Sequence, residues 1–271
     1  MDKKMNASPL LSQIKEAARG AGNIMLHAAL NQDSVMSKEG HANFVTIYDE
    51  KVQEYLIQRL SEILSEAHFV GEEEGQAAFR PEYETGFTFV IDPIDGTSNF
   101  MKAYRLSVTS IALLKDGAPY IGIIYNPYTD QLFSAEKNCG AYLNETRLQP
   151  VETPLKESLV GMGTSPYYGE EISRSSFEIA LWYLLRSIDV RRSGSAAWDL
   201  CMVAAGRTGL FFEPRLCLWN YAAGTCIIQE TGGTVTDLYG NPLSFRGISS
   251  VCAAAKGVAE EPYLPPAEMV K

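Results

Sequence analysis

The sequence predicts an α+β fold built in layers. Two stretches with helical periodicity lie near the N-terminus, hairpin-connected strands follow them, and strands and helices then alternate in the second half. Helices that precede an antiparallel sheet favour such a layered arrangement. The 271 residues suffice for one large core or two closely packed subdomains. We place these subdomains at residues 1–150 and 151–271.

The two predicted N-terminal helices cover residues 8–30 and 46–67, where apolar residues recur at helical spacing. Ser8 before Pro9 suits a helix N-cap followed by a first-turn proline. Asp49 lies in the first turn of the second helix, where an acid complements the helix dipole. This favourable interaction with the helix dipole is enough to explain an aspartate at position 49 without any role in a site.

The strands that follow are predicted to form an antiparallel sheet. An alternating pattern at residues 106–114 ends in the turn Lys115–Gly117, which is a hairpin signal. The expected strands lie at residues 87–91, 106–114, 120–125, 131–135 and 141–143.

The second half is predicted to contain a further layer of strands and helices. Its strands are expected at residues 159–163, 188–191, 209–213, 234–237 and 250–255, and its helices at 177–186 and 219–231. The Pro- and Glu-rich tail, 258–271, is expected to be loosely ordered. The helix over 177–186 is expected to bury Phe177, Ala180, Leu181, Leu184 and Leu185.

The most informative stretch is FTFVIDPIDGTSNF, Phe87 to Phe100. Its apolar strand ends in Asp92 and Asp95, and charges at the edge of a core are tolerated when they are paired, hydrogen-bonded or metal-bound. A proline between the two acids makes a rigid turn that can aim both at one point. Mg²⁺ prefers carboxylate and carbonyl oxygens, so the pattern indicates a Mg²⁺ site that holds a phosphate. The alternative is an ordinary strand-to-turn junction with capping aspartates.

Composition narrows the class of protein. The formal net charge is −10, which disfavours nucleic-acid binding through phosphate neutralisation. Five cysteines lie scattered without CxxC spacing, as is typical of reduced thiols in a cytosolic protein. The N-terminal sequence has no apolar signal-peptide core, and no apolar run is long enough to span a bilayer. We therefore expect a cytoplasmic location and no membrane partner.

Two further motifs accompany the central stretch: VGEEEG at residues 70–75 and LWNYAAG at residues 218–224. With all three in their order, the chain resembles the inositol monophosphatase family of Mg²⁺-dependent, lithium-sensitive phosphatases, from about residue 10 to about residue 255. The resemblance implies a layered αβαβα sandwich of the inositol monophosphatase and fructose-1,6-bisphosphatase type. It also implies a homodimer and two or three Mg²⁺ ions per active site.

The resemblance also assigns the metal and catalytic residues. Glu72, Asp92, Asp95 and the backbone carbonyl of Ile94 would hold metal, with Asn220 at a further ligand position. Glu72, Asp49 and Thr97 would be catalytic, the last two by binding the attacking water and taking up its proton. Glu73 would be a further metal or outer-shell candidate, and Lys38 a basic residue in the loop at 31–43, where a solvated loop lysine is the alternative.

Substrate contacts are predicted on both halves of the chain. The amides of Gly96 and Thr97 would hold phosphate oxygens at a helix start. Gly194, Ser195 and Ala196 open an apolar helix, so their backbone can approach a ligand closely, with simple helix packing as the alternative. By resemblance this stretch lines the substrate pocket, and Glu213 contacts sugar-alcohol hydroxyls. Asp199 is expected to be a structural partner instead.

One residue departs from the family pattern, which has an aspartate where this chain has Asn220. An amide still offers an oxygen and can still cap a helix, but it has no negative charge. A unit charge about 4 Å away is worth roughly 4 kcal/mol at an effective dielectric of about 20, so the second metal should be weakened.

The sequence thus favours metal-dependent hydrolysis of a small phosphate monoester by a metal-activated water, with inositol monophosphate or a similar polyol phosphate as substrate. Fructose bisphosphate, dinucleotide phosphates and adenosine 3′,5′-bisphosphate are alternative substrates of the same fold. A weakly active or non-catalytic phosphoester-binding protein is the alternative from another class, because of Asn220.

Overall fold

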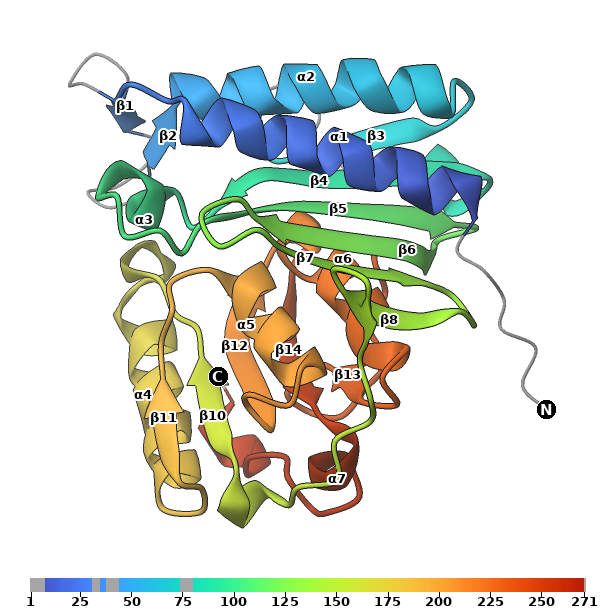
Figure 1. The fold of residues 1–271 in the computed structure, drawn as a ribbon. Coiled ribbons are helices and arrows are strands. Elements are labelled where there is room, and N and C mark those ends of the chain that lie inside the picture. The colour runs from blue at the N-terminus through green and yellow to red at the C-terminus, as the bar shows by residue number, and fades with distance from the viewer. Residues whose placement is uncertain (1–7, 31–34, 38–43, 74–79, 271) are drawn as a thin grey trace.

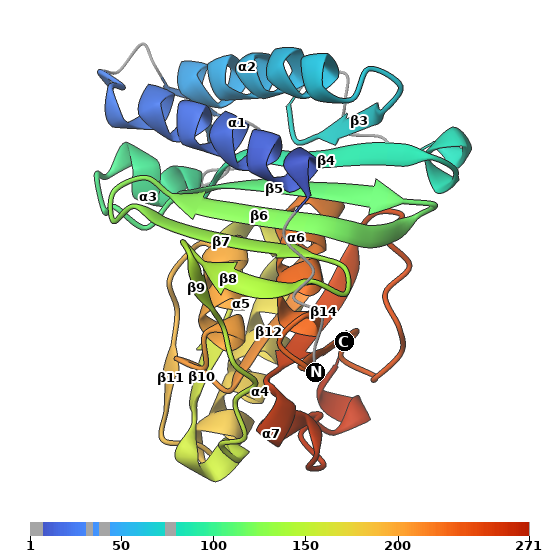
Figure 2. The same ribbon diagram turned by 45° about the vertical axis from the view of Figure 1, so that its right-hand side comes forward.

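The computed structural model describes residues 8–30, 35–37, 44–73 and 80–270. Its elements form αβαβα layers, as the sequence predicted. Figures 1 and 2 show α1 and α2 on one face of the larger sheet and α5 and α6 on its other face. The smaller sheet packs on α5 and α6, and α4 covers its far side. The helices are α1 (Pro9–Leu26), α2 (Ile47–Ile63), α3 (Thr97–Met101), α4 (Glu170–Leu184), α5 (Ala196–Ala204), α6 (Leu218–Gln229) and α7 (Lys256–Ala259).

The larger sheet has the strand order β3-β4-β5-β6-β7-β8-β9. β4 runs parallel to β3 and antiparallel to β5, and its pairing with β5 shifts register between Asp92 and Asp95. β4 therefore extends past the apolar stretch and carries both acids. The strands are β3 (His68–Gly71), β4 (Phe87–Asp95), β5 (Val108–Lys115), β6 (Ala118–Asn126), β7 (Gln131–Glu136), β8 (Gly140–Leu143) and β9 (Thr146–Arg147).

The smaller sheet has the strand order β11-β10-β12-β14-β13, with β10 parallel to β11 and β12. A further pair, β1 with β2, lies beside α3 in Figure 1. The strands are β1 (Val35–Ser37), β2 (Phe44–Thr46), β10 (Leu159–Met162), β11 (Asp189–Arg191), β12 (Leu210–Leu216), β13 (Thr234–Thr236) and β14 (Ser249–Ala254).

β4 separates two hydrophobic cores. Phe89 and Ile91 pack with α1 and α2, whereas Val90 joins the central core with Leu200 and Ile227. Successive side chains of a strand point to opposite faces, so one apolar stretch serves both layers. All of these side chains are almost completely buried. Because both faces of β4 are covered, the acids at its end sit at the edge of the protein interior.

The predicted cap and first-turn proline of the N-terminal helix are confirmed. Ser8 Oγ accepts a hydrogen bond from the Leu11 N–H at 3.1 Å, and Pro9 is the first residue of α1. The helices end earlier than the periodicity indicated, at Leu26 and Ile63. Apolar residues beyond those ends lie in the connections instead.

Two local predictions are wrong. α4 is longer than expected, and of the five side chains expected inward only Ala180 is buried. Ile179 and Tyr183 are buried beside it, whereas Phe177, Leu181 and Leu185 are more than half exposed. The C-terminal tail is packed, because the Tyr183 and Ser175 hydroxyls donate hydrogen bonds to backbone carbonyls within residues 263–269. Local periodicity identifies an apolar stripe on α4, but the packing of the sheet selects which stripe is buried.

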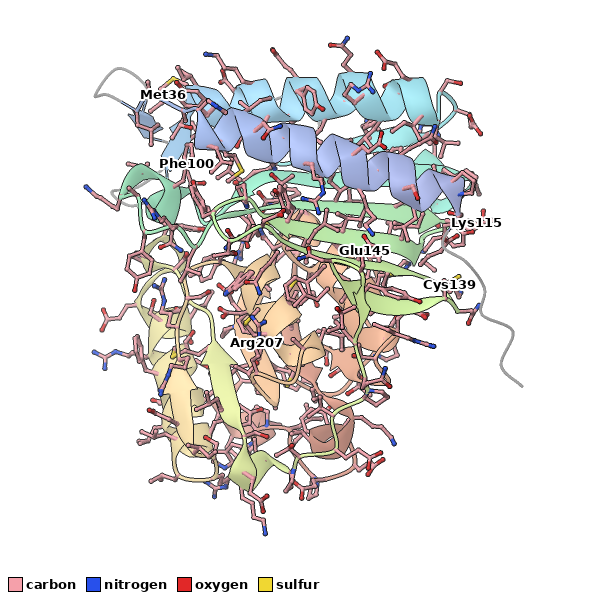
Figure 3. All side chains as sticks on the ribbon, viewed as in Figure 1. Met36, Phe100, Lys115, Cys139, Glu145 and Arg207 are labelled. Carbon is pink, nitrogen blue, oxygen red and sulfur yellow. The ribbon has the colours of Figure 1, made fainter. Side chains whose placement is uncertain are left out.

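The division at residue 150 falls between the two sheets in the chain, and it stays a prediction because α6 packs against both. None of the helices in the described ranges combines the length and apolar character needed to cross a bilayer. Figure 3 labels Phe100 at one end of the larger sheet and Lys115 and Cys139 at the other. The acids of β4 lie at the Phe100 end.

Replacing the α1 cap should destabilise the protein measurably. Ser8→Ala removes the acceptor of the Leu11 N–H, and such losses cost typically ~1 kcal/mol of the free energy of unfolding. Ser12→Ala is the matched control, since Ser12 is exposed inside the same helix and alanine favours helix there. Urea unfolding monitored by circular dichroism measures both. Equal midpoints for the two variants would contradict the capping role.

Candidate active site

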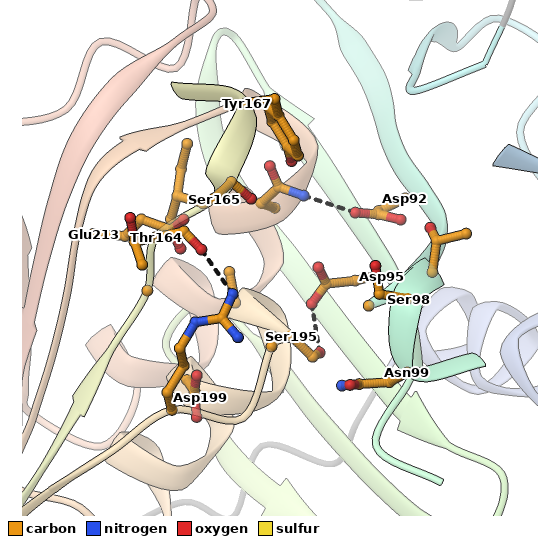
Figure 4. Close-up of a pocket in the computed structure, with 18 of the residues that line it drawn as sticks. Asp92, Asp95, Ser98, Asn99, Thr164, Ser165, Tyr167, Ser195, Asp199 and Glu213 are labelled. Atoms are coloured by element: carbon orange, nitrogen blue, oxygen red, sulfur yellow. Dashed lines mark hydrogen bonds between the residues drawn. The ribbon is translucent and has the colours of Figure 1, made fainter. Parts of the chain in front are cut away.

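A cavity opens where the end of β4 meets the start of α5 (Figure 4). It is walled by both halves of the chain, so residues far apart in sequence meet there. Asp49 does not line it but reaches it through Thr97. The other predicted site residues all line the cavity: Glu72, Asp92, Ile94, Asp95, Gly96, Thr97, Gly194, Ser195, Ala196, Glu213 and Asn220.

Asp95 joins the two halves. Its Oδ2 accepts hydrogen bonds from the Ser195 hydroxyl at 2.6 Å and from the Ala197 N–H at 2.7 Å, at the first turn of α5. Burial raises the pKa of Asp95 to about 6, although these hydrogen bonds oppose that shift. A carboxylate at a helix N-terminus satisfies free N–H groups and favours the helix dipole. Asp95 therefore fixes α5 against β4.

Asp92 is completely buried and only partly satisfied. Its Oδ2 accepts a hydrogen bond from Asn220 Nδ2 at 2.8 Å, drawn as a dashed line in Figure 4. Its Oδ1 has no hydrogen-bond partner. Burial raises the pKa of Asp92 well above its ordinary value, and the nearby carboxylates of Glu72 and Asp95 raise it further. A buried acid among other acids is poorly stabilised without a cation.

Asp49 has two roles: it caps α2 and it contacts Thr97 at the cavity. Its Oδ2 accepts hydrogen bonds from the N–H and the hydroxyl of Thr46, which cap α2. Its Oδ1 lies 3.4 Å from Thr97 Oγ1, which is also 3.2 Å from the Ile94 carbonyl oxygen. The cap leaves one carboxylate oxygen facing Thr97. Asp49 and Thr97, which were both predicted to bind the attacking water, are therefore hydrogen-bonded to each other.

Two glycines allow the halves to approach. Gly96 and Gly194 both have positive φ, +87° and +83°. A Cβ on Gly96 would lie 3.2 Å from both the Gly194 carbonyl oxygen and Ser195 Cβ. Only glycine adopts this conformation without strain, and the close approach excludes a larger side chain. The predicted substrate residues Gly96, Gly194 and Ser195 thus meet in one place.

Glu213 forms the far wall. It is buried on β12, and Tyr168 donates a hydrogen bond to its Oε1 at 3.2 Å. Burial raises the pKa of Glu213 to about 8, and the negative charge of Asp95 adds to that shift. Near neutral pH the folded protein therefore holds Glu213 largely as a neutral acid, which can donate as well as accept hydrogen bonds.

Asp199 has the structural role that the sequence suggested. Its Oδ2 accepts a hydrogen bond from the Ser193 hydroxyl at 2.7 Å, which shapes the turn before α5. Burial raises the pKa of Asp199 to about 7. The side chain also borders the cavity beside Arg192.

Sequence reasoning missed several lining residues. Asn99 lies inside the central motif and donates to the carbonyls of Leu106 and Ser193, both at 3.0 Å, so it ties the two halves together. Its place in the motif was the available signal. Thr164, Ser165, Tyr167 and Tyr168 come from a segment without a motif, and only the fold brings them to the cavity. Arg192 lies two residues before Gly194 of the predicted pocket stretch, and that position was the available signal.

Of the two acids that follow Glu72, the structure describes only Glu73. Glu73 is buried and its N–H donates to Gln53 Oε1 at 3.0 Å, which supports a structural contribution. Glu74 and Lys38 lie outside the described residues. Among the residues that are described, no three His, Cys, Asp or Glu side chains are arranged to hold a metal ion as they stand. The ligand set stays a prediction.

The donor set nevertheless fits a hard cation. Carboxylates and a backbone carbonyl at one cavity are the oxygen ligands that Mg²⁺ prefers. Asp92 Oδ1 is buried without a partner, and such an atom is costly unless something binds it. Oδ2 of Asp92 and of Asp95 is already hydrogen-bonded, so a cation competes with those contacts.

Known proteins are similar to this chain in sequence and in fold. The chain matches the model of the inositol monophosphatase family over residues 6–268. The inositol-1-monophosphatase of Bacillus subtilis is 34% identical, covering 88% of this chain and 89% of that protein. The Nus factor SuhB of Xylella fastidiosa is 32% identical, with 86% and 83% covered.

Solved structures of inositol monophosphatases have a similar fold. The staphylococcal SaIMPase-II with inositol monophosphate bound superimposes with a TM-score of 0.79 at 27% identity, covering 95% of this chain and 94% of that one. The same protein with 2′AMP bound has a TM-score of 0.76 at 28% identity, with 93% and 91% covered.

The layered fold and the acidic cavity define a protein of the phosphatase class. The family match spans nearly the whole chain, and the sequence resemblance is thereby confirmed. The chain belongs to the inositol monophosphatase family.

The raised pKa of Glu213 should make stability depend on pH. Its pKa is about 8 in the folded protein against 4.5 for an unperturbed glutamate, so the folded state binds more protons between these values. The free energy of unfolding therefore falls as pH rises through this window, by up to ~1.4 kcal/mol per pH unit for this group. Buried Asp95 and Asp199 contribute with the same sign at lower pH.

Glu213→Gln should flatten this dependence while Oε1 still accepts from Tyr168. Urea unfolding in EDTA at several pH values from 5 to 8 measures the slope. Glu66→Gln, at an exposed position, is the control and should keep the wild-type slope. A wild-type slope in Glu213→Gln would show that Glu213 is ionised in the folded protein.

Proposed function

We propose that this protein hydrolyses small phosphate monoesters, chiefly polyol phosphates such as inositol monophosphate. The observation that carries the proposal is the buried Asp92, whose Oδ1 has no partner, beside Glu72 and Asp95 at a cavity with the Thr97–Asp49 pair. Family membership supports it, and so does the relative solved with inositol monophosphate bound.

Glu72, Asp92, Asp95 and the Ile94 carbonyl would hold Mg²⁺. Bound there, the metal supplies charge neutralisation for the phosphate and lowers the pKa of a coordinated water. The negative charges of these residues otherwise repel an anionic substrate. Their convergence on one cavity makes a site for a phosphate only when cations accompany it.

Thr97 and Asp49 handle the proton of the attacking water. A threonine hydroxyl has one proton, so when it donates to Asp49 Oδ1 its oxygen is free to accept from water. The proton of the water then passes through Thr97 toward Asp49. Because Asp49 Oδ2 is held by Thr46, Oδ1 keeps its direction toward Thr97.

The rest of the cavity binds and orients the substrate. The Gly96 and Thr97 amides lie at the start of α3 and face the phosphate position that we propose. Glu213, held by Tyr168, recognises a substrate hydroxyl at the far wall. A polyol phosphate has hydroxyl groups for this contact, which is why we place it first among substrates.

Nucleotides are the second candidate class. Tyr167 lines the cavity and is 48% exposed, and an exposed aromatic ring is a surface on which a base can stack. SaIMPase-II has been solved with 2′AMP bound. Adenosine 3′,5′-bisphosphate, dinucleotide phosphates and fructose bisphosphate therefore belong in the substrate panel.

The proposal predicts Mg²⁺-dependent phosphate release that EDTA abolishes and lithium inhibits. Asp95→Asn should lower kcat/KM for inositol 1-phosphate by at least ~100-fold, since an amide lacks the charge and presents a donor. Phosphate release by a molybdate assay measures this, and Glu66→Gln should equal wild type. The absence of metal-dependent release from the whole panel would refute enzymatic function and leave a phosphoester-binding role.

We further propose a homodimer, with the exposed face of α4 as its contact. Phe177 and Leu181 line a shallow groove there together with Arg174 and Glu178, so apolar area lies beside charges of both signs. Such a surface can pair with the same surface of a second copy about a twofold axis. Covering it would remove the apolar side chains from water.

Leu181→Glu should therefore convert the dimer to monomer at micromolar concentration, because it places a charge in the apolar contact. Light scattering after gel filtration gives the mass. Leu26→Glu, at an exposed position on α1, should stay dimeric. A wild-type monomer, or a dimeric Leu181→Glu, would contradict this contact.

A cytoplasmic location is also proposed. All five cysteines are free thiols, and Cys201, Cys226 and Cys252 are buried. A reducing compartment keeps such thiols reduced. Fractionation of the native host followed by immunoblotting tests this, and recovery of the protein outside the cytoplasm would refute it.

A further inference from the structure

The amide of Asn220 has a determined orientation. Its Oδ1 accepts a hydrogen bond from the Cys217 N–H at 3.1 Å, and its Nδ2 donates to Asp92 Oδ2 at 2.8 Å. A flipped amide would set two N–H groups against each other and two oxygens against each other. Helix capping of α6 thus points the NH₂ group of Asn220 toward the acids.

This orientation changes what Asp92 offers to a cation. A carboxylate that bridges two cations through both of its oxygens needs each oxygen open. Here Oδ2 is occupied by an N–H donor, and only Oδ1 lacks a partner. Asn220 cannot supply a replacement oxygen, because its Oδ1 faces the backbone of Cys217. The partial positive charge on the NH₂ group also disfavours a cation beside it.

Oδ2 of Asp95 does not compensate for the occupied Oδ2 of Asp92. Its Oδ2 accepts hydrogen bonds from Ser195 and Ala197, which anchor α5. A second cation at Oδ2 of either aspartate would have to break a helix-anchoring contact or displace the Asn220 amide. Of the two oxygens of Asp92, only Oδ1 is open without such a cost.

We infer that Asn220 restricts Asp92 to one cation, bound at Oδ1, and that residue 220 sets how many divalent ions the cavity holds. This inference rests on the proposed metal-dependent function. An aspartate at 220 would keep the Cys217 cap, since one carboxylate oxygen can accept the same N–H. Its other oxygen would face Asp92 Oδ2, and a cation between them would relieve the repulsion.

The test counts ions by titrating Mn²⁺ into the full-length chain and measuring free Mn²⁺ by electron paramagnetic resonance. Asn220→Asp should bind one more Mn²⁺ per chain than wild type. Ser98→Asp is the control, because Ser98 is an exposed residue of the cavity wall and gains the same charge without altering the partners of Asp92. Ser98→Asp should bind as many ions as wild type.

Thermal melting provides a second readout that does not need activity. Asn220→Asp should melt below wild type in EDTA, because two carboxylates then face each other, and it should gain more from Mn²⁺ than wild type does. A variant that folds only with Mn²⁺ would agree with this.

Equal ion counts and equal Mn²⁺-dependent melting shifts in wild type and Asn220→Asp would overturn the inference and leave the proposed metal-dependent function standing. An additional ion in Ser98→Asp would also overturn it, since general charge would then be the cause. Failure of every variant to bind Mn²⁺ would remove both the inference and the metal site.

Discussion

The contact between Asp95 and the start of α5 is the interaction on which the site depends. A buried carboxylate is tolerated only when hydrogen bonds or cations compensate its lost hydration. The Ser195 hydroxyl and the Ala197 N–H supply part of this compensation across two halves of the chain. The same bonds satisfy the free end of a helix. The site and the packing of α5 therefore depend on the same contact, in which the acid and the helix stabilise each other.

The close approach of the two halves also explains the residues around this contact. Gly96 and Gly194 have positive φ, and a Cβ on Gly96 would press against the Gly194 carbonyl oxygen at 3.2 Å, so both features favour glycine there. Asn99 donates hydrogen bonds to the carbonyls of Leu106 and Ser193. Once Ser195 is held by Asp95, the preceding turn needs its own anchor, which Ser193 and Asp199 form. A change at any of these positions would move the cavity wall and loosen the packing together.

The sequence sufficed wherever one local segment contains all the information. The strand that ends in Asp92 and Asp95 and the cap at Ser8 were predictable, because alternation and capping act over a few residues. The inward face of α4 was not, since Phe177 and Leu181 and the buried Ile179 and Tyr183 are all apolar, and only the packing against the second sheet selects between them. Tyr167 and Tyr168 reach the cavity through tertiary structure alone.

Asn220 shows why a motif does not by itself determine chemistry. Its two local demands, a cap for α6 and a partner for Asp92, are met together by an amide, so the fold gives no sign of a defect. An aspartate would cap the helix equally well, yet it would offer an acceptor where the amide offers a donor. The cap of the helix can be kept in this exchange, whereas the charge in the cavity changes by a full unit. Substitutions at such a position can therefore retune metal binding while the surrounding structure stays intact.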